Sequence, residues 1–321
     1  MFNAQTEIAV RKGDAFDFSF ACKHYNIYPW IENGSELLRV ARLTDQAEPV
    51  LVRIAESSSG RDKRLLLSFT SARVLAADQL GALTGRIQWA LGLTDEVYPR
   101  LRDFAAGDKV IEAALRINRG IRFKRYLDPF EAICGAICAQ NVDFRRLYQM
   151  MKALAVAFGP AIHVGGIAYH AFPSASEIAT ASEEDLRACK VGYRAKLILG
   201  ASRFLDDQPE HLNMEVLKSE LADRAAERLC AVPGIGPYSA GIVLGAGIGR
   251  LDVFHLDSFT RLILRTFYFG GREVADADLL AFTRSKWGPY AGAVAHLLTT
   301  NTQEWAFTLG HENFRRSGAR I

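Results

Sequence analysis

The most informative segment of the chain is Leu229-Cys-Ala-Val-Pro-Gly-Ile-Gly-Pro-Tyr-Ser-Ala-Gly-Ile-Val-Leu244. Helical periodicity before Cys230 and after Pro237 brackets a turn from Pro233 to Gly236, whose two glycines allow positive φ and close backbone approach. Pro237 suits the first position of a helix. We therefore predict two helices joined by a glycine-rich hairpin whose free N–H groups can bind a phosphate. The same pattern also fits a purely structural helical hairpin.

A short apolar connector follows the hairpin and reaches Asp257, within Asp252-Val-Phe-His-Leu-Asp-Ser-Phe-Thr-Arg261. An aspartate at this place predicts the N-cap of another helix, worth about 1 kcal/mol. Backbone N–H groups also hold such a cap as a carboxylate, which would suit the stabilisation of a cationic transition state in an apolar cleft. The structural and the functional interpretation of Asp257 both remain open on local grounds.

The residues from Asp95 onward have helical periodicity with capping signals. Asp128-Pro-Phe-Glu131 places an acidic N-cap, a proline at N1 and a glutamate at N3 before an apolar run. Ser174 and Ser182 open two further short helices. Residues 101–321 are therefore predicted to form an all-helical region.

The first part of the chain, residues 1–100, has the pattern of an antiparallel sheet with helices packed on it. Short alternating runs are separated by turn-rich segments. The predicted strands are Glu36–Leu43, Pro49–Ile54 and Arg64–Phe69, and the predicted helices lie near Ala76–Leu91 and residues 20–25. The fold class is thus α+β, with a boundary near residues 95 to 115.

The composition narrows the class of protein. A chain of 321 residues corresponds to about two domains. Hydrophobic residues make up 49% and charged residues 23%, which excludes disordered, collagen-like and coiled-coil proteins. The net charge of +3 permits a polyanionic partner without requiring one. Because the pattern of a signal peptide and long apolar runs are both lacking, we expect no membrane partner and a cytoplasmic protein, associated with the nucleoid in a bacterium, or a nuclear one if eukaryotic.

Five cysteines are spread along the chain, and we interpret them as reduced intracellular thiols. Cys134 and Cys138 are spaced for one helical face, but no second pair or nearby histidine completes a zinc site, so we expect both in the core. No cysteine follows Cys230.

The hairpin and the aspartate together resemble a known family. Pro233-Gly-Ile-Gly-Pro-Tyr-Ser-Ala240 followed by Asp257 is similar to the signature of the helix-hairpin-helix (HhH-GPD) DNA glycosylase superfamily, in which a Leu-Pro-Gly-Ile-Gly hairpin precedes a catalytic aspartate. Three further segments extend the similarity over residues 110–300. The first, Asp128–Asn141, is similar to a helix whose terminal Gln or Asn pair enters the minor groove. The second, Lys190–Ile198, is similar to the Leu-Gly-Tyr-Arg-Ala segment of the 8-oxoguanine and 3-methyladenine branches. The third, Trp287–Ala293, is similar to the C-terminal helix of those branches.

The resemblance implies a role for individual residues. Asp257 would stabilise an oxocarbenium-like sugar and position or activate water while an N-glycosidic bond breaks. The target base would be extruded, and Gln140 with Asn141 would fill the gap as a minor-groove wedge, unless both are ordinary polar residues at a helix end. The DNA-binding hairpin would comprise Gly234, Ile235, Gly236, Tyr238 and Ser239. By the same resemblance, a monovalent cation would bind the backbone carbonyls of Cys230, Val232 and Ile235.

Tyr238 distinguishes between branches of the superfamily. Bifunctional members carry a lysine nucleophile at this position, and a tyrosine cannot form the Schiff base that leads to strand cleavage. The resemblance therefore implies a monofunctional enzyme without lyase activity. In the 3-methyladenine branch an aromatic residue commonly occupies this position, which favours cationic, alkylated purines stacked on aromatic walls. The candidates for those walls, each of which could equally be a core aromatic, are Tyr238, Phe259, Trp287 and Tyr290.

Two residues of this chain differ from the superfamily pattern, and one set of metal-binding cysteines is lacking. His255 stands where the superfamily usually has a proline before the aspartate, and Phe259 replaces the histidine typical of the 8-oxoguanine branch. The branches with an iron-sulfur cluster hold it with four cysteines after the aspartate, and this chain has none there, so no such cofactor is expected. The N-terminal strands, led by Phe16–Phe20, are similar to the TBP-like sheet domain of the two remaining branches.

Several groups of cations are candidates for phosphate contacts, although each group could instead be a solvated charged face. Arg194 and Lys196 flank the tyrosine of the third motif. The other candidates are the run Arg116, Arg119, Arg122, Lys124 and Arg125, and the terminal group Arg315, Arg316 and Arg320.

The resemblance thus predicts a monofunctional DNA glycosylase of base excision repair that acts on alkylated purines in damaged double-stranded DNA, as a monomer. An 8-oxoguanine-type glycosylase is the alternative enzyme. A non-catalytic protein that binds lesions is the alternative of another class, and it would have no need of Asp257.

Overall fold

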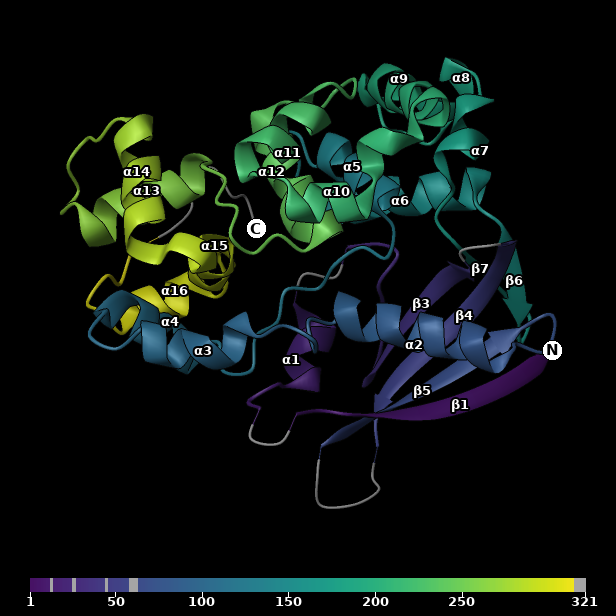
Figure 1. The fold of residues 1–321 in the computed structure, drawn as a ribbon, viewed down its shortest axis with the longest axis horizontal. Coiled ribbons are helices and arrows are strands. Elements are labelled where there is room, and N and C mark those ends of the chain that lie inside the picture. Colours follow the sequence, from purple (N-terminus) through teal and green to yellow (C-terminus); the bar gives the residue numbers. More distant parts are fainter. Residues whose placement is uncertain (12–13, 25–26, 44–45, 58–62, 315–321) are drawn as a thin grey trace.

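The computed structural model describes residues 1–314 except 12–13, 25–26, 44–45 and 58–62. A twisted sheet at the N-terminus lies beneath two helical lobes (Figure 1). One lobe is formed by residues 129–248, and the other by residues 97–117 together with 258–307. The α+β fold class predicted from the sequence is confirmed.

The five strands of the sheet are antiparallel and follow the order β1-β5-β4-β3-β2. Their bounds are β1 Phe2–Ala9, β2 Ile31–Asn33, β3 Glu36–Leu43, β4 Gln46–Glu56 and β5 Arg64–Ser71, and the helices of this part are α1 Phe18–Lys23 and α2 Ala77–Ala90. The three strands and the helix near residues 76–91 that the sequence predicted are all present. The expectation that Phe16–Phe20 leads the strands was wrong, because the Asp17 side chain accepts the N–H of Phe20 and begins α1 instead.

Both faces of the central strands are covered, which explains why five consecutive residues of β3 are buried. On one face Leu37 packs with Leu83 and Ile87 of α2. On the other face Leu38 packs with Ile162, which belongs to a later hairpin of β6 Ala161–Val164 and β7 Ile167–His170. This hairpin corrects the expectation of an all-helical region, and a turn of two glycines at positive φ makes it possible.

Several helices of the two lobes begin at side-chain caps, as predicted for α5, α7 and α8, where Asp128, Ser174 and Ser182 accept backbone N–H groups. The bounds are α3 Val97–Phe104, α4 Lys109–Ile117, α5 Pro129–Cys138, α6 Phe144–Phe158, α7 Ala175–Ala179, α8 Glu183–Ala188, α9 Arg194–Asp207, η1 Pro209–Leu212, α10 Met214–Ser219, α11 Ala222–Cys230, α12 Pro237–Val243, η2 Leu244–Ile248, α13 Ser258–Tyr268, α14 Asp276–Trp287, η3 Gly288–Tyr290, α15 Ala291–Thr299 and α16 Thr302–Phe307.

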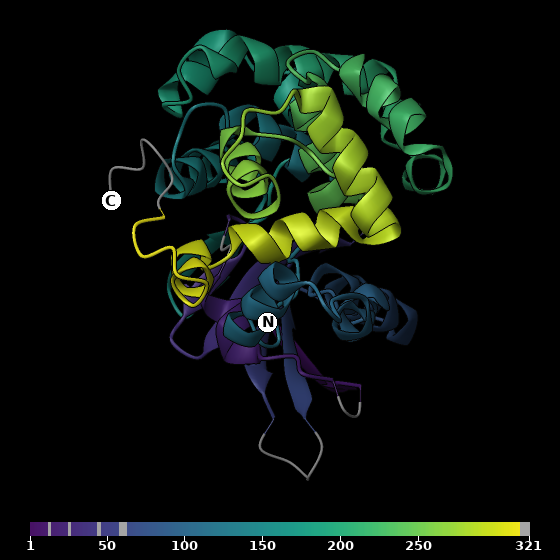
Figure 2. The ribbon, with the colours of Figure 1, turned by 90° about the vertical axis from the view of Figure 1, so that its left-hand side faces the viewer.

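The centre of the first lobe is α5, which is buried from Phe130 to Cys138 and packs against α6, α9 and α12. Cys134 and Cys138 are fully buried there as free thiols, which confirms their expected place in the core. In the second lobe α15 packs on α4, as the turned view shows (Figure 2). In the part of the chain that the structure describes, every helix is too short or too polar to span a bilayer.

Candidate nucleic-acid interface and active site

The predicted hairpin is the turn between α11 and α12. The N–H of Ile235 donates to the carbonyl of Val232 over 3.1 Å and closes it. Gly234 has φ +84°, and a Cβ added there would lie 3.0 Å from Cβ of Leu197, so the fold requires glycine at this position. Gly236 has an ordinary φ of −98°, and a Cβ added to it would meet no atom within 4 Å. The space outside Gly236 is therefore open to a ligand.

The side chains of the hairpin divide into two groups. Ile235 and Ser239 are buried, so only their backbone atoms could meet DNA. Tyr238 is 43% exposed and faces outward. The carbonyl of Val232, one of the three predicted for a monovalent cation, already accepts a hydrogen bond within the turn. Cation binding at this hairpin remains a prediction, and the described residues contain no cluster of three or more His, Cys, Asp or Glu side chains suited to a metal ion.

Asp257 caps α13 and is half-buried. Its Oδ1 accepts the N–H of Thr260 over 2.6 Å and the Thr260 hydroxyl over 2.9 Å, while the N–H of Asp257 donates back to that hydroxyl over 2.8 Å. Within the described chain Oδ2 accepts no hydrogen bond. The cap thus fixes the carboxylate and leaves one oxygen for a substrate or a water molecule.

His255 links the hairpin to Asp257. Its ring lies 5.3 Å from the ring of Tyr238, measured between centroids, in an edge-to-face arrangement at 80°. A Cβ added to Gly241 of α12 would lie 2.9 Å from Cβ of His255, so the connector passes close against this helix. Burial lowers the pKa of His255, and the Asp257 carboxylate opposes that shift. In the sequence, His255 was visible only as a departure from the usual proline.

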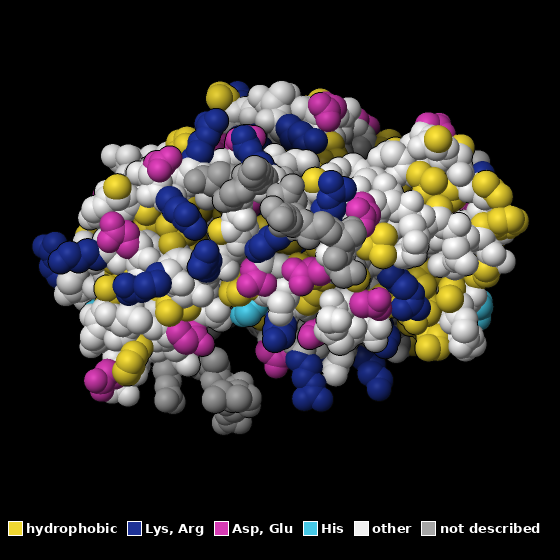
Figure 3. Space-filling model, turned by 90° about the horizontal axis from the view of Figure 1, so that it is seen from below, with side chains coloured by type: hydrophobic (Ala, Val, Ile, Leu, Met, Phe, Trp, Pro, Cys, Tyr) yellow, Lys and Arg dark blue, Asp and Glu magenta, His cyan; other side chains and the backbone are white. Residues whose placement is uncertain are grey.

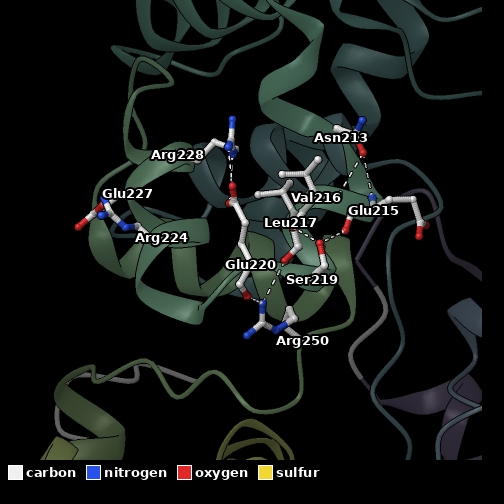
Figure 4. Close-up of polar contacts among 10 residues, drawn as sticks. All are labelled: Asn213, Glu215, Val216, Leu217, Ser219, Glu220, Arg224, Glu227, Arg228 and Arg250. Atoms are coloured by element: carbon white, nitrogen blue, oxygen red, sulfur yellow. Dashed lines mark hydrogen bonds and ion pairs between the residues drawn. The ribbon is translucent and has the colours of Figure 1, made fainter.

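Arg250 fixes the start of the connector that leads to Asp257 (Figure 4). Its Nη1 donates to the carbonyls of Leu217 and Glu220 at the end of α10, over 3.1 and 2.8 Å. Its Nε and Nη2 pair with the two carboxylate oxygens of Asp252 over 2.8 and 2.7 Å. Glu220 in turn pairs with Arg228 of α11. Sequence reasoning missed Arg250, because the two carbonyls that it binds lie 30 and 33 residues away in the chain.

The predicted wedge residues lie beside the hairpin and differ in role. Nε2 of Gln140 donates to the carbonyl of Gly234 over 3.2 Å, so Gln140 braces the hairpin. Asn141 is exposed and has φ +53°, which projects it from the turn after α5. Of the two, Asn141 is the residue that a DNA duplex could meet.

A second turn, before α9, lies against the Asn141 turn. Arg146 donates from its guanidinium to the carbonyl of Lys190, and Arg194 donates to the carbonyls of Gln140 and Val191. Arg194 is buried and stacks on the exposed ring of Tyr193 at 4.6 Å. Its predicted role as a phosphate contact is therefore corrected, because it ties the two turns together. Sequence reasoning did not assign a role to Arg146.

The cationic run before α5 lies mostly inside the protein. Arg122 pairs with Asp14, Arg125 pairs with Asp95, and Lys124 donates to the carbonyl of Ala21. All three cations are less than 9% exposed, so the predicted phosphate contacts of Arg122 and Lys124 were wrong. The exposed members of the predicted groups are Arg116, Arg119 and Lys196, whereas Arg315, Arg316 and Arg320 lie outside the described residues. On the face shown in Figure 3, Lys and Arg are interspersed with Asp and Glu and form no continuous patch.

The four candidate aromatic walls differ in how deeply they are buried. Trp287 is 1% exposed and is enclosed by Phe254, Tyr268 and Phe282, so its predicted place in a base pocket is corrected to the core of the second lobe. Phe259 is half-buried and packs near Phe314, and Tyr290 is half-buried in η3. Tyr238, Phe259 and Tyr290 remain candidates.

Known proteins that resemble this chain are DNA glycosylases, although no family model matches it. A probable N-glycosylase/DNA lyase of Methanothermobacter thermautotrophicus is 28% identical over 206 residues, which are 58% of this chain and 65% of the relative. The N-glycosylase/DNA lyase OGG1 of Arabidopsis thaliana is 30% identical over 211 residues, 61% of this chain and 56% of the relative. The matched region thus spans between half and two thirds of each of these relatives.

The fold has similar solved structures over nearly its whole length. A 3-methyladenine DNA-glycosylase from Archaeoglobus fulgidus aligns with a TM-score of 0.77 at 22% identity, covering 94% of this chain and 99% of the other. An 8-oxoguanine glycosylase/lyase of Clostridium acetobutylicum, solved with double-stranded DNA, aligns with a TM-score of 0.73 at 16% identity, covering 97% and 99%. The relatives and fold neighbours of this chain are DNA glycosylases, which confirms its resemblance to the helix-hairpin-helix DNA glycosylase superfamily.

Proposed function

We propose that the protein is a monofunctional DNA glycosylase of base excision repair that removes alkylated purines from double-stranded DNA. One observation carries this proposal: the open Oδ2 of a fixed Asp257 carboxylate lies two residues from His255, which packs on the exposed ring of Tyr238. The site thus combines an anion for a sugar cation with an aromatic face for a base. The similarity to proteins named as N-glycosylases supports the same class of reaction.

The proposed reaction replaces the base on C1′ with water. The C1′–N bond breaks, its electron pair leaves with the base, and the sugar becomes an oxocarbenium-like cation that the Asp257 carboxylate stabilises. A water molecule oriented by Oδ2 forms the new C1′–O bond and releases a proton to solvent. An N7- or N3-alkylated purine already carries a positive charge, so it leaves as a neutral base and requires no general acid.

The position of Tyr238 supports a reaction without strand cleavage. A lyase step begins with a primary amine that attacks C1′ and forms a Schiff base, which a phenol cannot do. Tyr238 occupies the second position of α12, where the bifunctional enzymes that the sequence resembles carry their lysine. Two sequence relatives carry the name DNA lyase, so this part of the proposal needs a direct test.

An 8-oxoguanine-type glycosylase is the second candidate. The relative from Arabidopsis and the similar fold from Clostridium acetobutylicum favour it. Tyr238 and Phe259 oppose it, because the resemblance places a lysine and a histidine there. A protein that only binds lesions is the third candidate, and the fixed carboxylate of Asp257 opposes it.

The decisive experiment offers the protein five duplexes, each with one 3-methyladenine, 7-methylguanine, hypoxanthine, 8-oxoguanine or uracil, followed by alkaline cleavage of abasic sites. We expect release of the methylated purines and no covalent adduct under borohydride. Release of 8-oxoguanine alone would establish the second candidate, and trapping with borohydride would contradict the monofunctional reaction. Binding without any release would favour the third candidate.

A further inference from the structure

His255 lies inside the proposed site but is not used by the proposed reaction. Its Nδ1 has no access to solvent and no hydrogen-bond partner among the described residues. A buried polar atom without a partner is unusual, because it costs about 1–3 kcal/mol. The titratable groups that face the ring are Asp257 on the same connector and Tyr238 on α12.

The packing around His255 leaves its ring little freedom. The ring lies across Tyr238, and the close approach to Gly241 leaves no space for a side chain on that turn of α12. A shift of the His255 ring would therefore move the Tyr238 ring, which presents its exposed part to solvent. His255 acts on any ligand of this site through Tyr238.

We propose that His255 is a specificity-determining residue, whose neutral side chain beside Tyr238 keeps this aromatic wall uncharged so that the site accepts a cationic purine. The inference rests on the proposed function, because it names the feature that would select alkylated bases.

The electrostatic reason concerns the face of Tyr238. A cationic base is attracted by the negative face of an aromatic ring, an interaction worth about 0.5 kcal/mol or more. An imidazolium 5.3 Å from the same ring would place a like charge beside the incoming base and would repel it. Burial lowers the pKa of His255, which favours the neutral ring at neutral pH. Protonating Nδ1 would also leave a charged N–H without a partner.

The test measures binding, so that it does not depend on turnover. The probes are two duplexes that differ in one nucleoside, a 2′-fluoro-7-methylguanosine or the corresponding 2′-fluoroguanosine, in which the fluorine protects the glycosidic bond. Fluorescence anisotropy gives the preference ratio, defined as the Kd for the unmodified duplex divided by the Kd for the methylated one. Contacts to the phosphate backbone cancel in this ratio.

Two substitutions separate charge from shape, since His255→Met and His255→Lys both remove the ring but differ in charge. At about pH 7.5 we expect His255→Met to keep the wild-type ratio within about threefold and His255→Lys to lower it about tenfold.

His211 supplies the matched control. It also packs edge-to-face on an aromatic ring, that of Phe204 at 4.8 Å, and its Nδ1 is likewise buried without a hydrogen bond. It lies in η1, which contacts α9 and α11, so His211→Phe should leave the ratio unchanged. Equal ratios for the Met and Lys variants would overturn the inference.

The outcomes also separate this inference from the proposed function. Release of alkylated bases combined with equal Met and Lys ratios would leave the glycosylase intact and remove the role of His255. A wild-type ratio of one, with release of 8-oxoguanine, would reject both the alkylated substrate and the role of His255.

Discussion

The segment 116–125 and the hairpin 229–244 differ in how open they are to a ligand, and their charges suggest the opposite order. The first carries five cations, and three of them are buried against Asp14, Asp95 and the Ala21 carbonyl. The second carries no cation between Leu229 and Leu244, yet it leaves open space at Gly236 and an exposed Tyr238. A count of cations would favour a segment in which three of the five cationic side chains are buried. Backbone N–H groups and open space mark an anion site better than charge does.

The largest effect is expected at Asp257, at the end of the connector that follows the hairpin. Asp257→Asn keeps an N-cap residue of nearly equal quality, so α13 and the melting temperature should change little. The neutral amide cannot stabilise a sugar cation, and base release should fall by about a hundredfold or more while duplex binding persists. Single-turnover release and anisotropy on the same duplex check this. Unchanged turnover would remove Asp257 from the mechanism and leave it as a cap.

The next largest effect is expected between the sheet and the first lobe, where a buried ion pair stabilises the fold. Arg39 of β3 pairs with Glu131 of α5, and both are buried. Arg39→Met leaves the Glu131 carboxylate without its counter-ion and should lower the free energy of unfolding by about 3–5 kcal/mol. Adding Glu131→Gln should restore much of it, as urea unfolding of both variants would reveal. A loss below about 1 kcal/mol would show that this pair contributes little.

Lys124 offers a test based on pH. Burial lowers its pKa to about 7 from an ordinary value of 10.5. Between these values the unfolded chain holds a proton that the folded chain has lost, so the free energy of unfolding rises with pH across this range. Lys124→Met should be more stable than the wild type near pH 7, by on the order of 2 kcal/mol, and this advantage should shrink toward pH 10. Urea unfolding of both proteins at three pH values checks this prediction. A difference in the free energy of unfolding that stays constant with pH would contradict a buried, neutral lysine.

A smaller effect sharpens the role of the hairpin. Gly236→Asp places a good N-cap residue in open space, so it should not destabilise α12. Its negative charge should weaken DNA affinity about tenfold at low salt and less at high salt. Gly236→Ala is the matched neutral control and should bind nearly as the wild type does. Equal affinities for the two variants would reduce the hairpin to a structural turn.

Much of the fold could be predicted from local sequence. Strands β3 and β5, the caps of α5, α7 and α8, and the Gly-rich turn before Pro237 all depend on residues close together in the chain. The two incorrect predictions have different causes. Phe16–Phe20 alternates like a strand, but Asp17 caps a helix, and β6 with β7 form because the outer face of the sheet needs a cover.

Only part of the candidate site could be predicted from local sequence. Asp257 was predicted as a helix cap from its local sequence, whereas its catalytic role and that of Tyr238 were implied by the resemblance to the superfamily. Trp287, by contrast, lies in a segment that resembles the superfamily, and only packing shows that Phe254, Tyr268 and Phe282 enclose it. Arg194 was expected at a phosphate, yet its contact with the Gln140 carbonyl spans 54 residues.

By itself the sequence determined the hairpin, the capped aspartate and the absence of a lysine at position 238, because glycine conformation, capping and side-chain chemistry act over a few residues. Only the tertiary structure decided which cations are buried, that His255 lies across Tyr238, and that Oδ2 of Asp257 stays open. Burial and hydrogen bonding depend on what the rest of the chain places around a residue, and a residue's type does not specify its neighbours.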